Sequence, residues 1–285
     1  MTARSRAKTL RRKVFSVLSV LARPQISNSR VSVHSLVLTN QMLESFKKLR
    51  HKIRVTLQSY LFRGSGRWCP VCEQSSRKFL KAGWEFRADA RCPHCESLER
   101  HRFLWLYLQR RTGLFDEQSR KLLHLAPEPC LSMRLQQFLG SGYVSADLMS
   151  SLAMLKLDIT ALPFGRHSFD VILCSHVLEH VVEDAQAMRE MVRVLKPGGY
   201  ALLMVPITAD ATIEDRSATS PEERLRLFGQ ADHVRRYGRD FTSRLQKAGF
   251  EVETVRVAGV FSTDEALKMG LHPPDRELYF ARPVS

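Results

Sequence analysis

The sequence lacks any apolar run that approaches the ~20 residues needed for a membrane-spanning helix, so no transmembrane span is expected. Cysteines are few: only six occur in 285 residues, and four of them form two CxxC pairs. This pattern argues against an extracellular disulfide framework and favours a reducing compartment. With 44% hydrophobic and 26% charged residues, the chain as a whole is neither disordered nor of low complexity.

Acidic residues are absent from the first 43 positions, and residues 1–67 hold 15 Lys and Arg against a single acid, Glu44. Residues 68–285 are nearly neutral at +1, so almost all of the net charge of +15 belongs to this basic arm. Such an arm suits RNA, an anionic membrane surface or an import receptor. A solvated tail without a partner is the alternative.

The start of the arm leaves the location open. Val14–Ala22 is apolar but short, and ten Ser and Thr lie within residues 1–40. A secretory signal, an organelle transit peptide and a basic cytoplasmic tail all fit this composition. We expect a cytoplasmic protein, with an organelle matrix or stroma as the alternative if residues 1–40 are a transit peptide.

Later in the arm, apolar residues recur at three- and four-residue steps and predict one stripe along a helix. The stripe comprises Leu43, Phe46, Leu49, Ile53, Leu57 and Leu61. We expect it to pack on the rest of the protein. Peripheral contact with a membrane interface is the alternative.

Residues 68–96 carry the most specific pattern. Cys69 and Cys72 form one CxxC, Cys92 and Cys95 form the other, and 19 residues separate the pairs. Two such turns supply the four thiolates that structural Zn²⁺ prefers, at a spacing typical of zinc sites. We predict a small zinc ribbon with a β-hairpin between the pairs. All four positions are cysteine, so the ion would be structural and its binding would supply folding energy.

A connecting segment, residues 97–119, follows the ribbon. Ser97 is a candidate N-cap for a helix that runs to Arg111. The charged residues Arg100, His101 and Arg102 are expected on a solvated basic face, with a cleft lining as the alternative.

Strand-like and helix-like segments alternate in residues 120–285. Six strands are predicted: 121–125, 143–146, 169–174, 200–205, 250–257 and 277–282. Three helices are predicted at 130–139, 182–195 and 240–247. Alternation of this kind indicates an α/β fold with a largely parallel sheet, which binds ligands at the carboxyl ends of its strands.

The order of motifs in this region resembles the class I S-adenosylmethionine-dependent methyltransferases, of the type 11 kind. The motifs are Phe169-Asp-Val-Ile-Leu-Cys-Ser-His-Val-Leu-Glu-His180, a following helix, and Lys196-Pro-Gly-Gly199 before an apolar strand. The resemblance implies a Rossmann-like seven-stranded sheet with helices on both faces, preceded here by the zinc ribbon and the basic arm.

The resemblance also implies S-adenosylmethionine as the cofactor. Asp147 stands where the family places the acid that binds the ribose, and Asp158 where it places the group that recognises the adenine. The remaining cofactor positions implied by the match are His124, Ala126, Glu128, Ile159, Cys174 and Ser175.

One loop departs from the family pattern. Residues 123–130 read LHLAPEPC and contain no glycine, whereas the family has a glycine-rich loop there. Ala126 occupies the place of the first loop glycine, and Glu128 is placed to contact the amino acid part of the cofactor. The ribbon, this loop and FGQADHVRRYG together resemble bacterial-type zinc-ribbon methyltransferase-domain proteins of undetermined substrate.

A long insert, residues 207–239, is predicted to form a substrate lid. His176, His180 and His233 are the candidate bases, because an imidazole can accept a proton near neutral pH. His176 and Glu179 follow the predicted strand 169–174, and His176, Glu179 and His233 are the preferred catalytic residues. The predicted activity is O-methylation of a small molecule or a saccharide. An RNA methyltransferase that uses the ribbon and arm, and a non-catalytic ribbon protein with a degenerate cofactor site, remain as alternatives.

Overall fold

The structure is a computed structural model that describes residues 33–83, 86–116, 118–273 and 276–284. The chain divides into two units, with the boundary between Ile53 and Arg54. The predicted targeting segment Val14–Ala22 and Trp84 of the ribbon lie outside the described residues.

Helix α2 (Val33–Leu61) carries the apolar stripe and crosses the boundary between the two units. The six side chains of the stripe are all at least 50% exposed. That the stripe packs on another part of the protein remains a prediction. Within the described part of the chain, no helix is both long enough and apolar enough to cross a bilayer.

The cysteine region folds into two small antiparallel hairpins. Strand β1 (Arg67–Cys69) pairs with β2 (Gln74–Ser76), and β3 (Leu80–Ala82) pairs with β4 (Arg87–Arg91). The predicted hairpin between the two CxxC pairs is therefore present.

Helix α3 (Glu99–Arg111) follows the ribbon, and two expectations about it are wrong. Its N-cap is Leu98, because the Ser97 hydroxyl lies 3.2 Å from Cys69 Sγ instead of capping the helix. His101 and Arg102 are buried rather than solvated, at 6% and 0% exposed. The helix lies inside the protein and is covered on several sides.

Arg102 explains how a charge is accommodated there. Its guanidinium donates to the backbone oxygens of Ala90 and Ser97 in the ribbon region and of Met269 and Gly270 near the end of the chain. Because a planar guanidinium carries several N–H donors in a fixed arrangement, one buried arginine can donate to a set of carbonyl oxygens.

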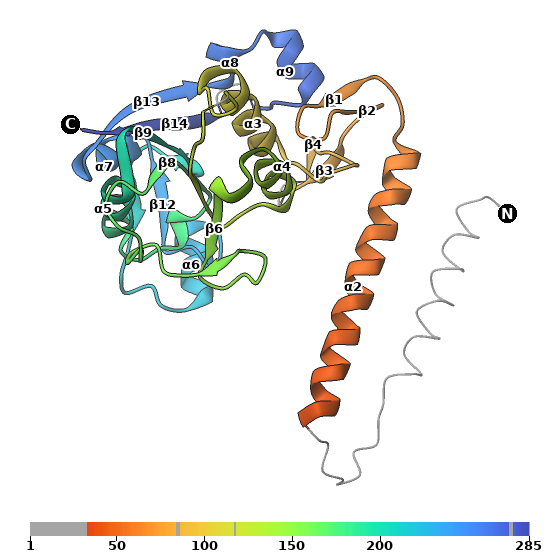
Figure 1. The fold of residues 1–285 in the computed structure, drawn as a ribbon, viewed down its shortest axis with the longest axis horizontal. Coiled ribbons are helices and arrows are strands. Elements are labelled where there is room, and N and C mark those ends of the chain that lie inside the picture. The colour runs from red at the N-terminus through yellow and green to blue at the C-terminus, as the bar shows by residue number, and fades with distance from the viewer. Residues whose placement is uncertain (1–32, 84–85, 117, 274–275, 285) are drawn as a thin grey trace, which may run out of the picture. The chain divides into compact units, whose positions relative to one another are not determined.

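A seven-stranded sheet forms the body (Figure 1). Its order is β13 (Phe250–Arg256), β14 (Glu277–Pro283), β9 (Leu195–Met204), β8 (Phe169–Ser175), β5 (Leu122–Leu125), β6 (Tyr143–Asp147) and β7 (Leu155–Lys156). Strand β14 is antiparallel to both neighbours, and the other pairings are parallel. This is the Rossmann-like seven-stranded sheet that the resemblance implies.

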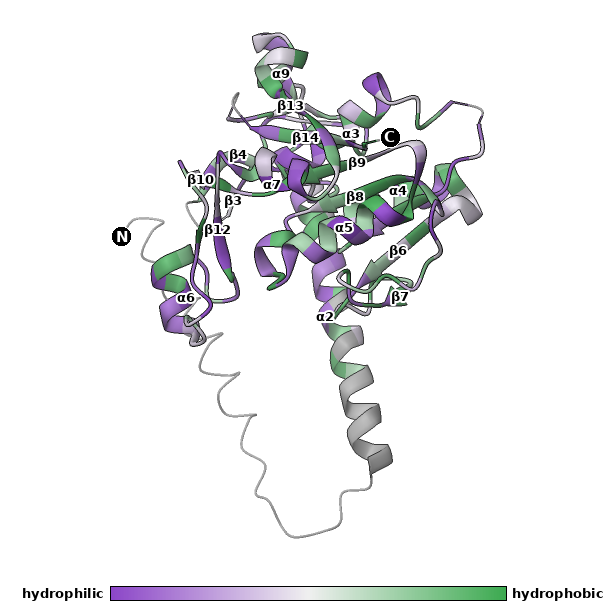
Figure 2. Cartoon of the chain, turned by 90° about the vertical axis from the view of Figure 1, so that its left-hand side faces the viewer, coloured by the Kyte–Doolittle hydropathy of each residue, from purple (hydrophilic) through white to green (hydrophobic). Residues whose placement is uncertain are grey.

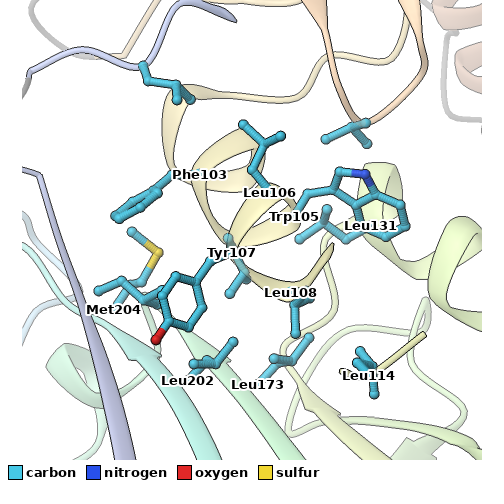
Figure 3. Packing of buried hydrophobic residues seen from close by; sticks show 14 of the residues in the cluster. Phe103, Trp105, Leu106, Tyr107, Leu108, Leu114, Leu131, Leu173, Leu202 and Met204 are labelled. Carbon is cyan, nitrogen blue, oxygen red and sulfur yellow. The ribbon is translucent and has the colours of Figure 1, made fainter. Parts of the chain in front are cut away.

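Helices cover both faces of the sheet, because successive strand residues point to opposite sides. On one face Leu173 and Leu202 share a core with α3 and with α4 (Pro129–Leu139). On the other, Ile172 and Leu203 share a second core with α5 (Asp184–Val194) and α7 (Phe241–Lys247). Strands β8 and β9 are correspondingly hydrophobic in Figure 2. Figure 3 shows α3 residues such as Phe103 and Tyr107 packed against Leu202 and Met204.

Six of the strands were predicted to within a few residues, and β7 was not predicted at all. Strand β9 also begins earlier than expected, at Leu195. Phe169 pairs with Leu195 but Val171 pairs with Tyr200, so the Pro-Gly-Gly segment bulges out of the ladder instead of preceding the strand. Gly198 makes this possible with a φ of +76°.

The insert has its own secondary structure. It forms β10 (Ile207–Ala209), β11 (Ile213–Glu214), α6 (Pro221–Phe228) and β12 (Arg235–Gly238), with the three strands in the order β10-β12-β11. After strand β13 come the short helices α8 (Val257–Val260) and α9 (Thr263–Met269). Arg235 donates to the backbone oxygens of Leu178, Val181 and Val182. The insert is thereby fixed to the segment that follows β8.

Candidate functional site

The sheet order brings three strand ends together. Strands β6, β5 and β8 are consecutive parallel neighbours, so their carboxyl ends meet at one edge. In open α/β sheets this edge is where ligands bind. Nearly all the predicted cofactor and catalytic residues lie at these ends or in the loops that follow them.

The loop after β5 turns sharply although it contains no glycine. Ala126 adopts a φ of +48°, in the left-handed region that favours glycine. Its N–H donates to the Ala146 carbonyl at 2.8 Å, which ties the loop to the end of β6. Ala126 thus takes the backbone conformation expected of the missing glycine, at a cost in strain of about 1 kcal/mol.

Glu128 closes the same loop. Its Oε2 lies 2.8 Å from Nε2 of the buried His124, whose Nδ1 lies 3.0 Å from the Tyr143 hydroxyl. Its Oε1 lies 3.5 Å from His101 Nε2 and has no hydrogen-bond partner among the described residues. This second oxygen remains available to a ligand.

The electrostatics of the loop keep Glu128 ionised. Burial by itself would raise the pKa of Glu128, but the His124 hydrogen bond and the charges of His124, His101 and Arg100 outweigh it and lower that pKa to about 2. Burial lowers the pKa of His101 to about 3, although Glu128 opposes this change. The loop therefore presents a carboxylate to the sheet edge at neutral pH.

Asp147 ends β6 with one free oxygen. Its Oδ1 accepts hydrogen bonds from the N–H groups of Met149 and Ser150, at 2.7 and 2.6 Å. Among the described residues, no hydrogen bond reaches Oδ2. A carboxylate oxygen in this position can accept from two vicinal hydroxyls.

Asp158 and Ile159 follow β7 and differ in exposure. Asp158 is exposed, and its Oδ1 accepts from the N–H and the hydroxyl of Thr160, both at 2.8 Å. Ile159 is 7% exposed and belongs to the core on the α5 face. The structure therefore shows Ile159 as a packing residue beneath the edge.

Cys174 and Ser175 end strand β8. Cys174 is 1% exposed, and burial raises the pKa of its thiol, so it stays protonated and unreactive. Ser175 is 5% exposed, and its hydroxyl has no hydrogen-bond partner within the described part of the chain. Like Glu128 Oε1, this is a buried polar atom at the sheet edge that a ligand could satisfy.

The next residue, His176, is held by Glu179. His176 adopts a φ of +55°, the second left-handed non-glycine residue at this edge. Its Nδ1 lies 3.1 Å from Oε1 of the buried Glu179. A carboxylate on Nδ1 fixes the ring orientation and leaves Nε2 free to accept a proton.

The insert brings His233 to the same place. The His233 and His180 rings meet edge to face, with centroids 4.8 Å apart. The Val234 N–H donates to the Glu179 carbonyl at 2.9 Å, which holds the insert beside the strand end. Burial lowers the pKa of His233. His180, the third of the candidate bases, joins this group.

The four ribbon cysteines also converge. Cys69 Sγ lies 3.7 Å from Cys95 Sγ, and Cys72 Sγ lies 3.7 Å from Cys92 Sγ. Sulfurs placed ~2.3 Å from a common tetrahedral ion stand about 3.8 Å apart. These two distances match such an ion, and all four sulfurs lie within 4.8 Å of one another.

Some partners of the site were not visible in the sequence. Tyr143 and His101 support the β5 loop, and Ser97 lies 3.2 and 3.3 Å from the sulfurs of Cys69 and Cys95. Each comes from a segment predicted for another role. Only the fold shows these contacts.

Comparison with known proteins agrees with the fold. Residues 135–203 match the family model of a methyltransferase domain. The ubiquinone/menaquinone biosynthesis C-methyltransferase UbiE of Yersinia pestis (strain Pestoides F) is 34% identical over 91 residues, 32% of this chain and 34% of that protein. The chain therefore spans about one third of the length of the curated relatives it matches.

An S-adenosylmethionine-dependent methyltransferase from Mesorhizobium loti is 16% identical with a TM-score of 0.46, covering 62% of this chain and 96% of that chain. Residues 135–203, which match the methyltransferase-domain model, include strands β6 to β8 and most of β9 of the seven-stranded sheet.

Proposed function

We propose that the protein transfers a methyl group from S-adenosylmethionine to a hydroxyl of a small molecule or saccharide. The observation that supports this most is the set of unsatisfied groups at one sheet edge. Glu128 Oε1 and Ser175 Oγ are buried without hydrogen-bond partners among the described residues, and Asp147 offers a free oxygen. These three groups end or follow the strands that flank the cofactor in this fold class.

The donor chemistry suits the parts of the cofactor. Asp147 would accept from the ribose hydroxyls, and Glu128 would pair with the ammonium of the amino acid part. Asp158, exposed beyond β7, would lie near the adenine. When bound, the cofactor supplies an electrophilic methyl group, and the protein has to place the acceptor in line with it.

A proton also has to leave the acceptor hydroxyl. His176 is the candidate base, since Glu179 holds its Nδ1 and its Nε2 is open to an acceptor. The insert, which hydrogen-bonds to the segment after β8, would cover the acceptor and exclude water. His233 is the second candidate for contact with the acceptor.

The ribbon cysteines would hold one structural Zn²⁺ through Cys69, Cys72, Cys92 and Cys95. The sulfur spacing supports this, and four cysteine ligands leave no position for a substrate. RNA is a weaker proposal for the acceptor, because the positive charge is concentrated in residues 1–67 and the remainder is nearly neutral.

A carbon acceptor is the second candidate reaction. The matched UbiE relatives are named as C-methyltransferases. A base such as His176 that deprotonates an enolic or phenolic hydroxyl would also activate a neighbouring carbon.

Cofactor binding to the full chain tests the proposal. Calorimetric titration with S-adenosylhomocysteine should give one site, and Asp147→Ala should weaken binding about tenfold or more, because each lost hydrogen bond to a charge is worth ~1.5–3 kcal/mol. Asp116→Ala, on an exposed pair with Arg120 before β5, is the matched control and should bind normally. Absence of binding at millimolar ligand would reject the enzyme and favour a ribbon protein with a degenerate site.

A further inference from the structure

Two histidines and a glutamate, from two segments of the chain, meet beyond the end of β8. Glu179 and His180 lie in the single-turn helix after the strand (Leu178–His180), and His233 comes from the insert. One nitrogen or oxygen atom from each of the three lies within 4.8 Å of those from the other two. This cluster is distinct from the four-cysteine set.

Glu179 carries an unused negative oxygen in the interior. The side chain is 1% exposed, and only its Oε1 has a partner, the His176 ring at 3.1 Å. Its Oε2 is buried and accepts no hydrogen bond from the described residues. A buried carboxylate oxygen without a partner is costly unless a cation or a donor meets it.

His180 is oriented as metal-bound imidazoles usually are. His180 Nδ1 lies 3.2 Å from the Asp232 backbone oxygen, so this nitrogen carries the proton and Nε2 keeps its lone pair. Metal-bound imidazoles commonly donate their other N–H to a carbonyl or carboxylate in this way. His233 is 5% exposed, and its ring nitrogens form no hydrogen bond with side chains or backbone in the described ranges.

We propose that Glu179, His180 and His233 bind one divalent transition-metal ion. Two imidazoles and one carboxylate suit ions such as Zn²⁺ and Co²⁺, whereas Mg²⁺ and Ca²⁺ prefer oxygen ligands alone. Nitrogen and oxygen ligands of a tetrahedral ion stand about 3.3 Å apart, so the three side chains must close slightly on the ion. His180, whose side chain is 36% exposed, has room to rotate.

A metal ion at this place would narrow the class of methyl acceptor, and this step rests on the proposed function. Three protein ligands leave an open coordination position. A hydroxyl oxygen of the acceptor would occupy that position, and coordination would lower the pKa of the hydroxyl. His176, held by the same Glu179, is then close enough to the ion to receive the proton. The acceptor class is an alcohol or phenol that can bind a metal.

Cobalt titration of the full chain tests the site. The protein is first loaded with one equivalent of Zn²⁺ to fill the four-cysteine set, and then titrated with Co²⁺ by calorimetry and absorption. One further ion should bind, with a spectrum of nitrogen and oxygen ligands and without a thiolate charge-transfer band. His180→Ala should weaken this binding at least tenfold and leave the zinc content unchanged.

The matched control is His167→Asn. His167 is exposed and precedes the other end of β8, so Co²⁺ binding should stay as in the wild type. Glu179→Gln preserves the shape of the buried side chain, should weaken binding at least tenfold, and is checked by thermal unfolding. Failure of the wild type to bind a second ion at millimolar Co²⁺ overturns the proposal, as does wild-type affinity in both variants.

The cofactor titration separates this inference from the proposed function. Binding of S-adenosylhomocysteine without a second metal ion rejects the metal site alone. Binding of the metal ion without the cofactor rejects the methyltransferase alone.

Discussion

The ribbon and the sheet are built on different principles. The ribbon has four strands of three to five residues, in two separate two-stranded sheets, around four cysteines. The body has seven strands in one sheet between two apolar cores. In a region with so little surface to bury, the proposed metal ion would supply stability that the sheet obtains from hydrophobic burial.

The two regions nevertheless share one core. Cys69, Val71 and Phe79 of the ribbon belong to the same apolar cluster as Phe103 and Met204. Arg102 connects the regions by polar contacts, with carbonyl partners in both and its guanidinium 4.4 Å from the Phe79 ring. The two regions therefore differ in how each is stabilised, while the boundary between them lies within one cluster of buried residues.

Removal of one metal ligand should have the largest effect. Cys69→Ser should lower the zinc retained after dialysis by about one ion per chain, because structural zinc contributes ~10–16 kcal/mol to folding of such modules. The ribbon should then become sensitive to limited proteolysis. Zinc content after dialysis and mapping of the cleavage sites measure both effects.

Cys130→Ser is the control for that experiment. Cys130 is also buried, but its sulfur contacts His101 and lies outside the four-cysteine set. It should retain zinc. Full zinc content in Cys69→Ser would contradict the assignment of the ligands.

Loss of the buried arginine should have the next largest effect. Arg102→Leu removes one donor from each of four backbone oxygens, of which Ser97 O keeps the Cys92 N–H, and should lower the free energy of unfolding by about 3–5 kcal/mol. Arg110→Leu on the same helix is the control, because its pair with Glu265 is exposed and worth about 1 kcal/mol or less. Urea unfolding of both variants gives the comparison. Equal losses would show that Arg102 does not join the two regions.

The smallest effect is the change in the free energy of unfolding with pH that comes from His101, in helix α3 between the ribbon and the sheet. His101 has a folded-state pKa of about 3 against an ordinary value of 6.5. Between these values the unfolded chain binds a proton that the folded chain does not, so stability falls as the pH falls through this window. At 1.36 kcal/mol per unit, the loss at about pH 5 is ~2 kcal/mol.

His101→Gln removes this contribution. The unfolding free energy of the variant should therefore decrease less than that of the wild type between about pH 7 and pH 5. Urea unfolding at several pH values measures the two slopes. Identical slopes would mean that folding does not lower the pKa of His101.

Much of the fold could be predicted because its signals are local. Runs such as 169–174 and the CxxC pairs carry their own periodicity or spacing. Strand β7 was missed because it has two residues, Leu155 and Lys156, both exposed. Arg102 was misplaced because a charged residue in a helix indicates solvent unless its distant carbonyl partners are known.

The candidate site was predictable only in part for a similar reason. The resemblance points to Asp147, Glu128 and His176 individually, and the fold brings them to one edge. Ala126 could not be assigned the left-handed conformation from its identity, since alanine rarely adopts it. The grouping of His180 with His233 depends on how the insert folds, and no pattern in residues 207–239 encodes that contact.

The position of β14 bears on how the chain folds during synthesis. This strand is translated last of the seven, yet it lies inside the sheet, between β9 and β13. Until β14 has been translated, β13 has no strand to pair with, and β9 can pair along one edge only, with β8. The four ribbon cysteines lie within 27 consecutive positions and are translated long before. If these cysteines bind the proposed ion, a nascent chain can bind it early, whereas the sheet closes only when residues 277–283 have left the exit tunnel.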